Sequence, residues 1–197
     1  MRLPLSLSLL LCTAVMVPGC TAPQQSPVLA PASGSTNRYG APVLTQPELD
    51  VSPFVDDRCA LLTRTQLRQL GITVAGRPGD GPLGKDCSWR AFDTPARIAL
   101  SLTVNTELGG LDNLYARKHW FRVWKPLEIS GYPAVIADDP VQHLGDCQIT
   151  LAISRTIMIP ANMTLNPGVD KPSDFTDPCS RGVKILEQVI ITLQGRR

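Results

Sequence analysis

The sequence predicts an α+β domain in which an antiparallel sheet has its helices packed on one face. From residue 53 onward the chain reads in the order helix, hairpin, helix, several strands, helix. The segments 87–92 and 97–105 alternate apolar and polar residues with a period of two, as half-buried strands do. A run of strands with a few helices around it is typical of the α+β class.

The first element is predicted as a short helix over residues 64–70. Thr63 is a favourable N-cap, Gln66 stands three residues later as its capping-box partner, and Gly71 marks the end. Four leucines supply the apolar face of this segment: Leu61, Leu62, Leu67 and Leu70. The stretch that follows, residues 76–84, is rich in glycine and proline and is predicted to be a loop.

The middle of the chain predicts strands on both sides of a second helix. Residues 87–92 and 97–105 alternate around a turn-like Asp-Thr-Pro, which favours a hairpin. Residues 109–120 open with two glycines and predict the helix, with Leu111, Leu114 and Tyr115 at helical spacing. The later segments predicted as strands are 126–131, 132–138 and 147–154 continuing into 155–163.

The last element is predicted as a helix over residues 178–193. Asp177 is its N-cap and Pro178 takes the first helical position, where a proline costs no hydrogen bond. Its apolar residues fall on one stripe: Val183, Leu186, Val189, Ile190 and Leu193.

The start of the chain has the pattern of an export signal. Arg2 supplies a positive charge, and the apolar run 3–17 would span about 22 Å as a helix, short of the roughly 30 Å hydrocarbon core of a bilayer. Residues 17–20, Val-Pro-Gly-Cys, resemble the lipobox of bacterial lipoproteins. We therefore expect removal of residues 1–19 and lipidation of Cys20, with a plain secretory signal as the alternative. Two acyl chains, such as palmitate, would hold the chain on the membrane.

The composition also predicts how the mature chain is organised. Residues 20–52 are rich in proline, alanine and serine and bury too little apolar surface to fold, so they are predicted to be a flexible tether. Residues 53–197 are predicted to form a single domain.

Four cysteines remain after the signal and the lipidated residue: Cys59, Cys87, Cys147 and Cys179. An even number in an exported chain predicts two disulfides. Pairing Cys59 with Cys87 and Cys147 with Cys179 is favoured because it joins cysteines close in sequence, while the nested pairing of Cys59 with Cys179 and Cys87 with Cys147 stays open. The wide spacing predicts no metal site.

Several short motifs, taken in order, resemble one family. They are Cys59, Cys87-Ser88-Trp89, Gly131-Tyr132-Pro133-Ala134, Cys147 and Asp177-Pro178-Cys179. They resemble an actinobacterial lipoprotein family that carries the domain of unknown function numbered 3558. Asp57-Arg58-Cys59 departs from the expected Asp-Pro-Cys. The resemblance implies a lipoprotein of the cell envelope and no particular activity, and analogy with other lipoproteins of this size suggests a Mog1/PsbP-like α-β sandwich.

Charge and motifs exclude several classes of ligand. The formal net charge of +2 is too balanced to indicate a nucleic acid partner. Residues 79–85 match most of a phosphate-binding loop, but Asp86 stands where a serine or threonine must bind magnesium. A strand rather than a helix is predicted to follow. We therefore expect neither nucleotide binding nor any cofactor.

Two segments carry candidate functional residues. Trp120, Phe121 and Trp124 form either an apolar binding surface with cations at its rim or a strand whose residues divide between core and surface. His143, beside Asp138, Asp139 and Asp146, suggests a hydrolase, but no G-x-S-x-G sequence supplies a nucleophile. We expect this segment to be a solvated turn.

These observations predict a lipid-anchored protein on the extracytoplasmic face of the cell membrane. Its predicted role is a binding or accessory module, not an enzyme, for an envelope protein or a small ligand. The alternatives are a structural protein of the envelope without a ligand pocket and the hydrolase that would use His143.

Overall fold

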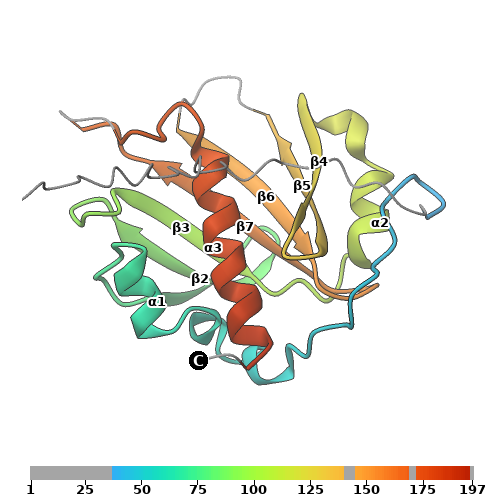
Figure 1. Cartoon of the computed structure of the whole chain (residues 1–197), viewed down its shortest axis with the longest axis horizontal. Coiled ribbons are helices and arrows are strands. Elements are labelled where there is room, and N and C mark those ends of the chain that lie inside the picture. The colour runs from blue at the N-terminus through green and yellow to red at the C-terminus, as the bar shows by residue number, and fades with distance from the viewer. Residues whose placement is uncertain (1–36, 140–144, 169–171, 196–197) are drawn as a thin grey trace, which may run out of the picture.

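A seven-stranded antiparallel sheet with helices around it forms the fold, as the computed structural model shows (Figure 1). The structure describes residues 37–139, 145–168 and 172–195. The strand order is β1-β2-β3-β7-β6-β5-β4, and every neighbouring pair is antiparallel. The strands are β1 (Arg77–Gly81), β2 (Gly84–Ala91), β3 (Ile98–Thr103), β4 (Val123–Ile129), β5 (Tyr132–Asp138), β6 (Asp146–Ala152) and β7 (Met158–Leu165). The predicted α+β class with an antiparallel sheet is confirmed.

Three α-helices and three short 3-10 helices accompany the sheet in the described residues. The α-helices are α1 (Arg64–Gln69), α2 (Gly110–Tyr115) and α3 (Pro178–Leu193), and the 3-10 helices are η1 (Ser52–Phe54), η2 (Arg58–Leu61) and η3 (Lys118–Trp120). No helix in the described ranges is long and apolar enough to cross a membrane.

Helix α1 has the predicted capping box and is fixed to α3. The backbone N–H of Gln66 donates to Thr63 Oγ1 over 3.3 Å, and the backbone N–H of Thr63 donates to Gln66 Oε1 over 2.8 Å. Gln66 Nε2 also donates to the carbonyl of Gln188, and the hydroxyl of Thr192 donates to Gln66 Oε1. One side chain therefore caps α1 and joins it to the last helix.

Helix α3 covers one face of the sheet and buries most of the core, which we call the α3-side core (Figure 1). Its largest fully buried members on the sheet are Trp89, Ile98, Leu100, Leu102, Leu127, Ile129, Ile149, Leu151 and Ile159. Gly182 allows α3 to approach closely, because a Cβ there would lie 3.1 Å from the side chains of Ile149 and Met163. Four of the predicted stripe residues are buried against this core: Val183, Leu186, Val189 and Ile190.

Helix α2 packs on the opposite face, which corrects the prediction that all helices share one face. The α2-side core consists of Ala41, Leu111, Tyr115, Val135, Ala137, Ala152 and Met158. Strand β5 is buried along its whole length, with Ala134 and Ile136 in the α3-side core and Val135 and Ala137 in the α2-side core. An apolar run without alternation is the signature of a strand covered on both faces.

Residues 76–84 were predicted to be a loop, but they contain strand β1 and its turn into β2. Strand β1 pairs with β2 from Arg77 to Gly81, so the sheet extends one strand beyond the predicted hairpin. β1 and β4 are the two edges of the sheet, and each contains a proline, Pro78 or Pro126. A proline on an edge strand removes a donor and so discourages pairing with another chain.

The tether was predicted to extend to residue 52, but residues 37–52 pack against the domain. Ala41 is fully buried in the α2-side core, and Val51 is buried in the α3-side core. The backbone N–H of Leu49 donates to the carbonyl of Ile153, and the Tyr132 hydroxyl donates to the carbonyl of Pro47. The predicted signal and the tether before residue 37 lie outside the described residues.

The two disulfides join the pairs that the sequence favours. Cys59–Cys87 connects η2 to β2, and Cys147–Cys179 connects β6 to the first turn of α3. Cys87 and Cys147 are fully buried, so both bridges are part of the α3-side core. The nested alternative is thereby overturned.

Candidate functional site

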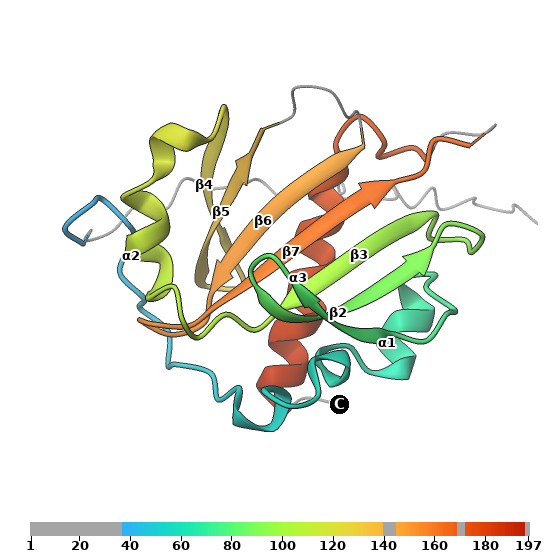
Figure 2. The same ribbon diagram turned by 180° about the vertical axis from the view of Figure 1, so that it is seen from behind.

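One face of the sheet carries polar side chains over strands β2, β3, β7 and β6, and no helix of the described residues covers them. Figure 2 shows this face toward the viewer, with α3 behind the sheet and α2 at one side. Ser88 is opposite Ser101, Ser101 is opposite Asn162, and Asn162 is opposite Gln148 in the strand register. These four residues form a continuous polar row across four strands, which we call the polar row.

Charged groups flank the polar row, and together with it they line a shallow cleft of about 520 Å³. Asp86 and Arg90 line it from β2, and Asp146 lines it from β6. The hydroxyl of Ser101 donates to Asp86 Oδ2 over 2.5 Å, so this serine is held by a carboxylate. The lining therefore offers hydroxyl, amide, carboxylate and guanidinium groups close together.

The polar row was not predicted from the sequence, although its residues lie in segments that were predicted to be strands. The predicted strands at 87–92, 97–105 and 147–163 include the polar residues of this site, but no role was assigned to those residues. What makes them a site is the register, which brings one polar residue from each strand into the same row. Register depends on pairing between distant segments and is not written in any single one of them.

The aromatic segment that was predicted as a binding surface or core divides between the two. Phe121 and Trp124 are partly buried against the α2-side core, where the Trp124 ring meets Tyr115 edge-on at 4.8 Å between centroids. Trp120 points outward and keeps 64% of its surface exposed. Burial raises the pKa of Tyr115 to about 12. The structure therefore leaves Trp120 alone of these three as a surface residue.

The residues considered for catalysis are only partly brought together. Asp138, Asp139 and Asp146 line the same cleft as Ser88 and Ser101, while His143 lies outside the described residues. Asp139 forms an ion pair with Arg122 over 3.2 Å, and both side chains are largely exposed. No group of His, Cys, Asp or Glu side chains suited to a metal ion occurs in the described part of the chain.

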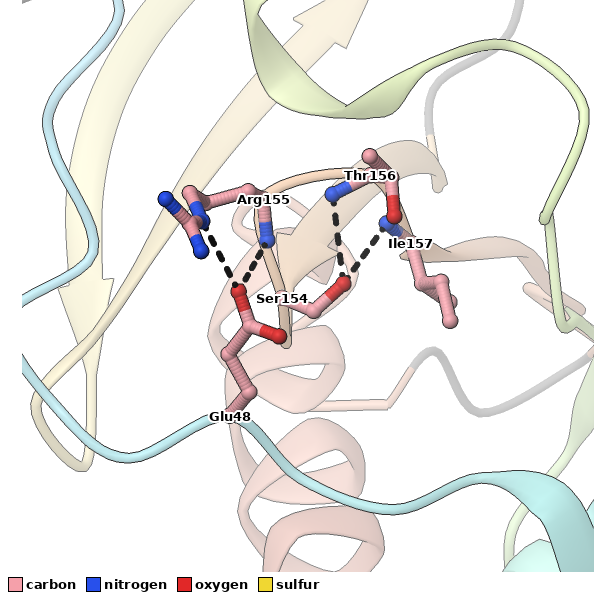
Figure 3. Close-up of polar contacts among 5 residues, drawn as sticks. All are labelled: Glu48, Ser154, Arg155, Thr156 and Ile157. Atoms are coloured by element: carbon pink, nitrogen blue, oxygen red, sulfur yellow. Dashed lines mark hydrogen bonds and ion pairs between the residues drawn. The ribbon is translucent and has the colours of Figure 1, made fainter.

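The N-terminal segment is attached to the turn between β6 and β7, beside α2. One oxygen of Glu48 accepts from the backbone N–H of Arg155 and from its guanidinium, while the Ser154 hydroxyl accepts from the backbone N–H groups of Thr156 and Ile157 (Figure 3). Gly110 packs on the same turn, because a Cβ there would clash with the carbonyl oxygen of Arg155. The chain therefore enters the fold on the side where α2 lies.

Comparison with known proteins places the chain in a family. No curated protein and no solved structure matches it significantly, so the Mog1/PsbP-like analogy stays a prediction. A family model matches residues 15–192, which include Cys20, both disulfides and every strand of the sheet. The chain belongs to the family described as "Protein of unknown function (DUF3558)".

Proposed function

We propose that this protein is an extracytoplasmic lipoprotein, anchored through Cys20, that binds a polar ligand on the uncovered face of its sheet. Three features support the anchor. The apolar run before Cys20 is too short to span a bilayer, the sequence at 17–20 resembles a lipobox, and the matched family region begins at residue 15, within that run. Two disulfides fit an oxidising compartment outside the cytoplasm.

The polar row is the observation that supports a binding role. Asn162 and Gln148 each present both a donor and an acceptor, whereas the hydroxyl groups of Ser88 and Ser101 donate to the carbonyl of Arg77 and to Asp86 Oδ2 and so offer acceptor lone pairs to a ligand. Asp86 and Asp146 add acceptors, and Arg90 adds donors. Groups of this kind satisfy a ligand rich in hydroxyl groups better than an apolar one, so the ligand class we propose is a neutral saccharide.

The same geometry favours binding over the two alternatives. A serine nucleophile needs a neighbouring base that is itself oriented by a third group, whereas the Ser101 hydroxyl donates to a carboxylate. A structural role would be supported by a flat apolar patch, whereas this surface is a cleft in which polar side chains from four strands gather. The protein therefore acts by holding its ligand rather than by changing it.

The anchor is tested with a Cys20→Ala variant of the full chain in its native host. The wild-type chain should incorporate radiolabelled palmitate and sediment with membranes, and the variant should remain uncleaved or be released. Normal processing and unchanged membrane retention of the variant would contradict the lipoprotein assignment.

The binding site is tested by titrating the purified chain with a panel of neutral oligosaccharides and following amide chemical shifts. We expect shifts on β2, β3, β6 and β7, and loss of at least tenfold in affinity for Asn162→Ala and Gln148→Ala. Gln69→Ala is the matched control, because it removes an exposed amide from α1 on the opposite face. An equal effect of the control, or shifts elsewhere only, would contradict this site.

A further inference from the structure

Two exposed aromatic residues, each with an arginine against its ring, lie beside α2. The guanidinium carbon of Arg38 is 5.4 Å from the ring centroid of Tyr39, and that of Arg117 is 5.7 Å from the ring centroid of Trp120. Tyr39 is 43% exposed and Trp120 is 64% exposed. With the exposed Lys118, these four residues form what we call the α2 surface.

The two pairs are fixed to the same short helix. The backbone N–H of Tyr39 donates to Asp112 Oδ1 over 3.4 Å, and Arg117 Nε donates to the carbonyl of Asn113 over 3.1 Å. Leu111 and Tyr115 of α2 point into the α2-side core, so the helix turns its opposite side to solvent between the two pairs. Both aromatic residues are therefore exposed beside α2, Tyr39 through its own contact with the helix and Trp120 through Arg117.

The chemistry of this surface matches that of a membrane interface. Tryptophan and tyrosine rings favour the headgroup region, where one end is apolar and the other is hydrated. The α2 surface holds three cations, and the carboxylate in contact with it is Asp112, so these residues carry a net positive charge. Such a charge is attracted by anionic lipids, at about 1 kcal/mol for each lysine or arginine near the membrane surface.

The position of the chain's entry into the fold supports the same partner. Residues 37–41 form a turn that lies beside α2 in both views, and Ala41 is buried in one cluster with Leu111 and Tyr115 (Figures 1 and 2). The segment that leads back from Asn37 to Cys20 therefore starts beside the α2 surface. An anchor on that segment attaches the domain to the bilayer from a point beside the α2 surface.

We propose that the α2 surface docks on anionic lipid headgroups and sets the orientation of the anchored domain. This inference rests on the proposed anchor at Cys20, which supplies attachment, while the α2 surface supplies orientation. The anchored chain would then have a docked state favoured by anionic lipid and an undocked state in neutral lipid.

The test uses the acylated full chain, purified from membranes and reconstituted into vesicles that contain brominated lipids. Bromine quenches tryptophan fluorescence on contact. Trp89 is fully buried and Trp124 is partly buried, so the difference in fluorescence between the wild-type chain and a Trp120→Phe variant gives the Trp120 signal. We expect quenching of Trp120 in phosphatidylglycerol vesicles and little in phosphatidylcholine vesicles. Each of Arg117→Gln and Lys118→Gln should lower the docked-to-undocked ratio about fivefold.

Arg64→Gln is the matched control, since it removes an exposed cation from α1 and should leave the quenching unchanged. Equal quenching in both lipids, or no quenching in either, would overturn the proposal. A blue shift of the Trp120 fluorescence without quenching would also overturn it, because that result indicates a protein partner or a second copy on this surface. Failure of the anchor is seen separately, as failure to float with phosphatidylcholine vesicles. In that case the docking proposal is tested by flotation of the unacylated chain with phosphatidylglycerol vesicles. Flotation of the wild-type chain that is lost in Trp120→Ala would support docking. Absence of flotation of the wild-type chain would overturn the docking proposal.

Discussion

Gly76 lies directly against Cys87 of the first disulfide. A Cβ atom at Gly76 would be 2.5 Å from Cys87 Sγ and 2.9 Å from two ring atoms of Trp89. Neither neighbour is the free end of a flexible side chain, because the sulfur is bonded to Cys59 and the indole is fully buried. The chain therefore needs a glycine where it passes over the disulfide into β1.

We expect Gly76→Ala to lower the free energy of unfolding by about 1–3 kcal/mol, the usual cost of forcing an extra carbon into a packed core. Chemical denaturation of the oxidised chain measures this. Ala75→Ser, at the exposed neighbouring residue, should change stability by less than about 0.5 kcal/mol. Equal stability of Gly76→Ala and wild type would show that this close approach does not exist in solution.

Removal of either disulfide should cost much of the domain's stability. In the chain-entropy model, loops with sequence separations of 28 and 32 residues each correspond to about 3–4 kcal/mol. The double variants Cys59→Ala/Cys87→Ala and Cys147→Ala/Cys179→Ala should therefore unfold at much lower denaturant concentration than wild type. Non-reducing peptide mapping is the independent check, and a peptide that joins Cys87 to Cys147 or Cys179 would contradict the pairing.

Local signals in the sequence were sufficient for the elements that a few neighbouring residues define. The capping box of Thr63 and Gln66 defines the start of α1, and the alternation in β2 and β3 defines their hairpin. In α3, Pro178 stands in the first turn as predicted, although Asp177 makes no side-chain cap hydrogen bond. In each case the interactions responsible lie within one or two turns or strands.

Long-range contacts account for the elements that were missed. Strand β1 is made of glycine, proline and charged residues, a composition that by itself favours a loop. It is a strand because its backbone pairs with that of β2. Residues 37–52 have the composition of a tether. Ala41 and Val51 nevertheless pack against apolar residues on the two faces of the sheet, whose strands lie later in the sequence. The polar row likewise exists only after four strands are paired.

The glycine-rich sequence at 79–86 should not bind nucleotides. These residues form the β1–β2 hairpin, whereas a phosphate-binding loop leads into a helix whose amide groups face the phosphates. The Asp86 carboxylate also lies over β1, since a Cβ at Gly79 would be 2.8 Å from its Oδ1 and one at Gly81 would be 3.2 Å from its Oδ2. A negative charge thus occupies the glycine-lined space.

Isothermal titration calorimetry with ATP and magnesium should therefore show no heat of binding. A micromolar dissociation constant that Lys85→Ala abolishes would contradict this prediction.

Stability should decrease at alkaline pH because of Tyr115. Within the described residues no group hydrogen-bonds to its buried hydroxyl, and burial raises its pKa to about 12. The phenol of an unfolded chain titrates near 10. Below pH 10 both states are protonated, so the contribution of Tyr115 is fully present. Between about pH 10 and 12 the unfolded chain loses its proton while the folded chain retains it, and the contribution decreases as pH rises.

Tyr115→Phe isolates this effect, because it keeps the ring that meets Trp124 and removes only the hydroxyl. At pH 8 the variant should be as stable as wild type or slightly more stable, since a buried donor without a partner is removed. From pH 10 to 11.5 wild type should lose more stability than the variant, as read from the denaturation midpoints of both chains. Parallel decreases in the two chains would mean that the Tyr115 hydroxyl is hydrated or bonded in solution, and that α2 lies less closely on the sheet than the structure shows.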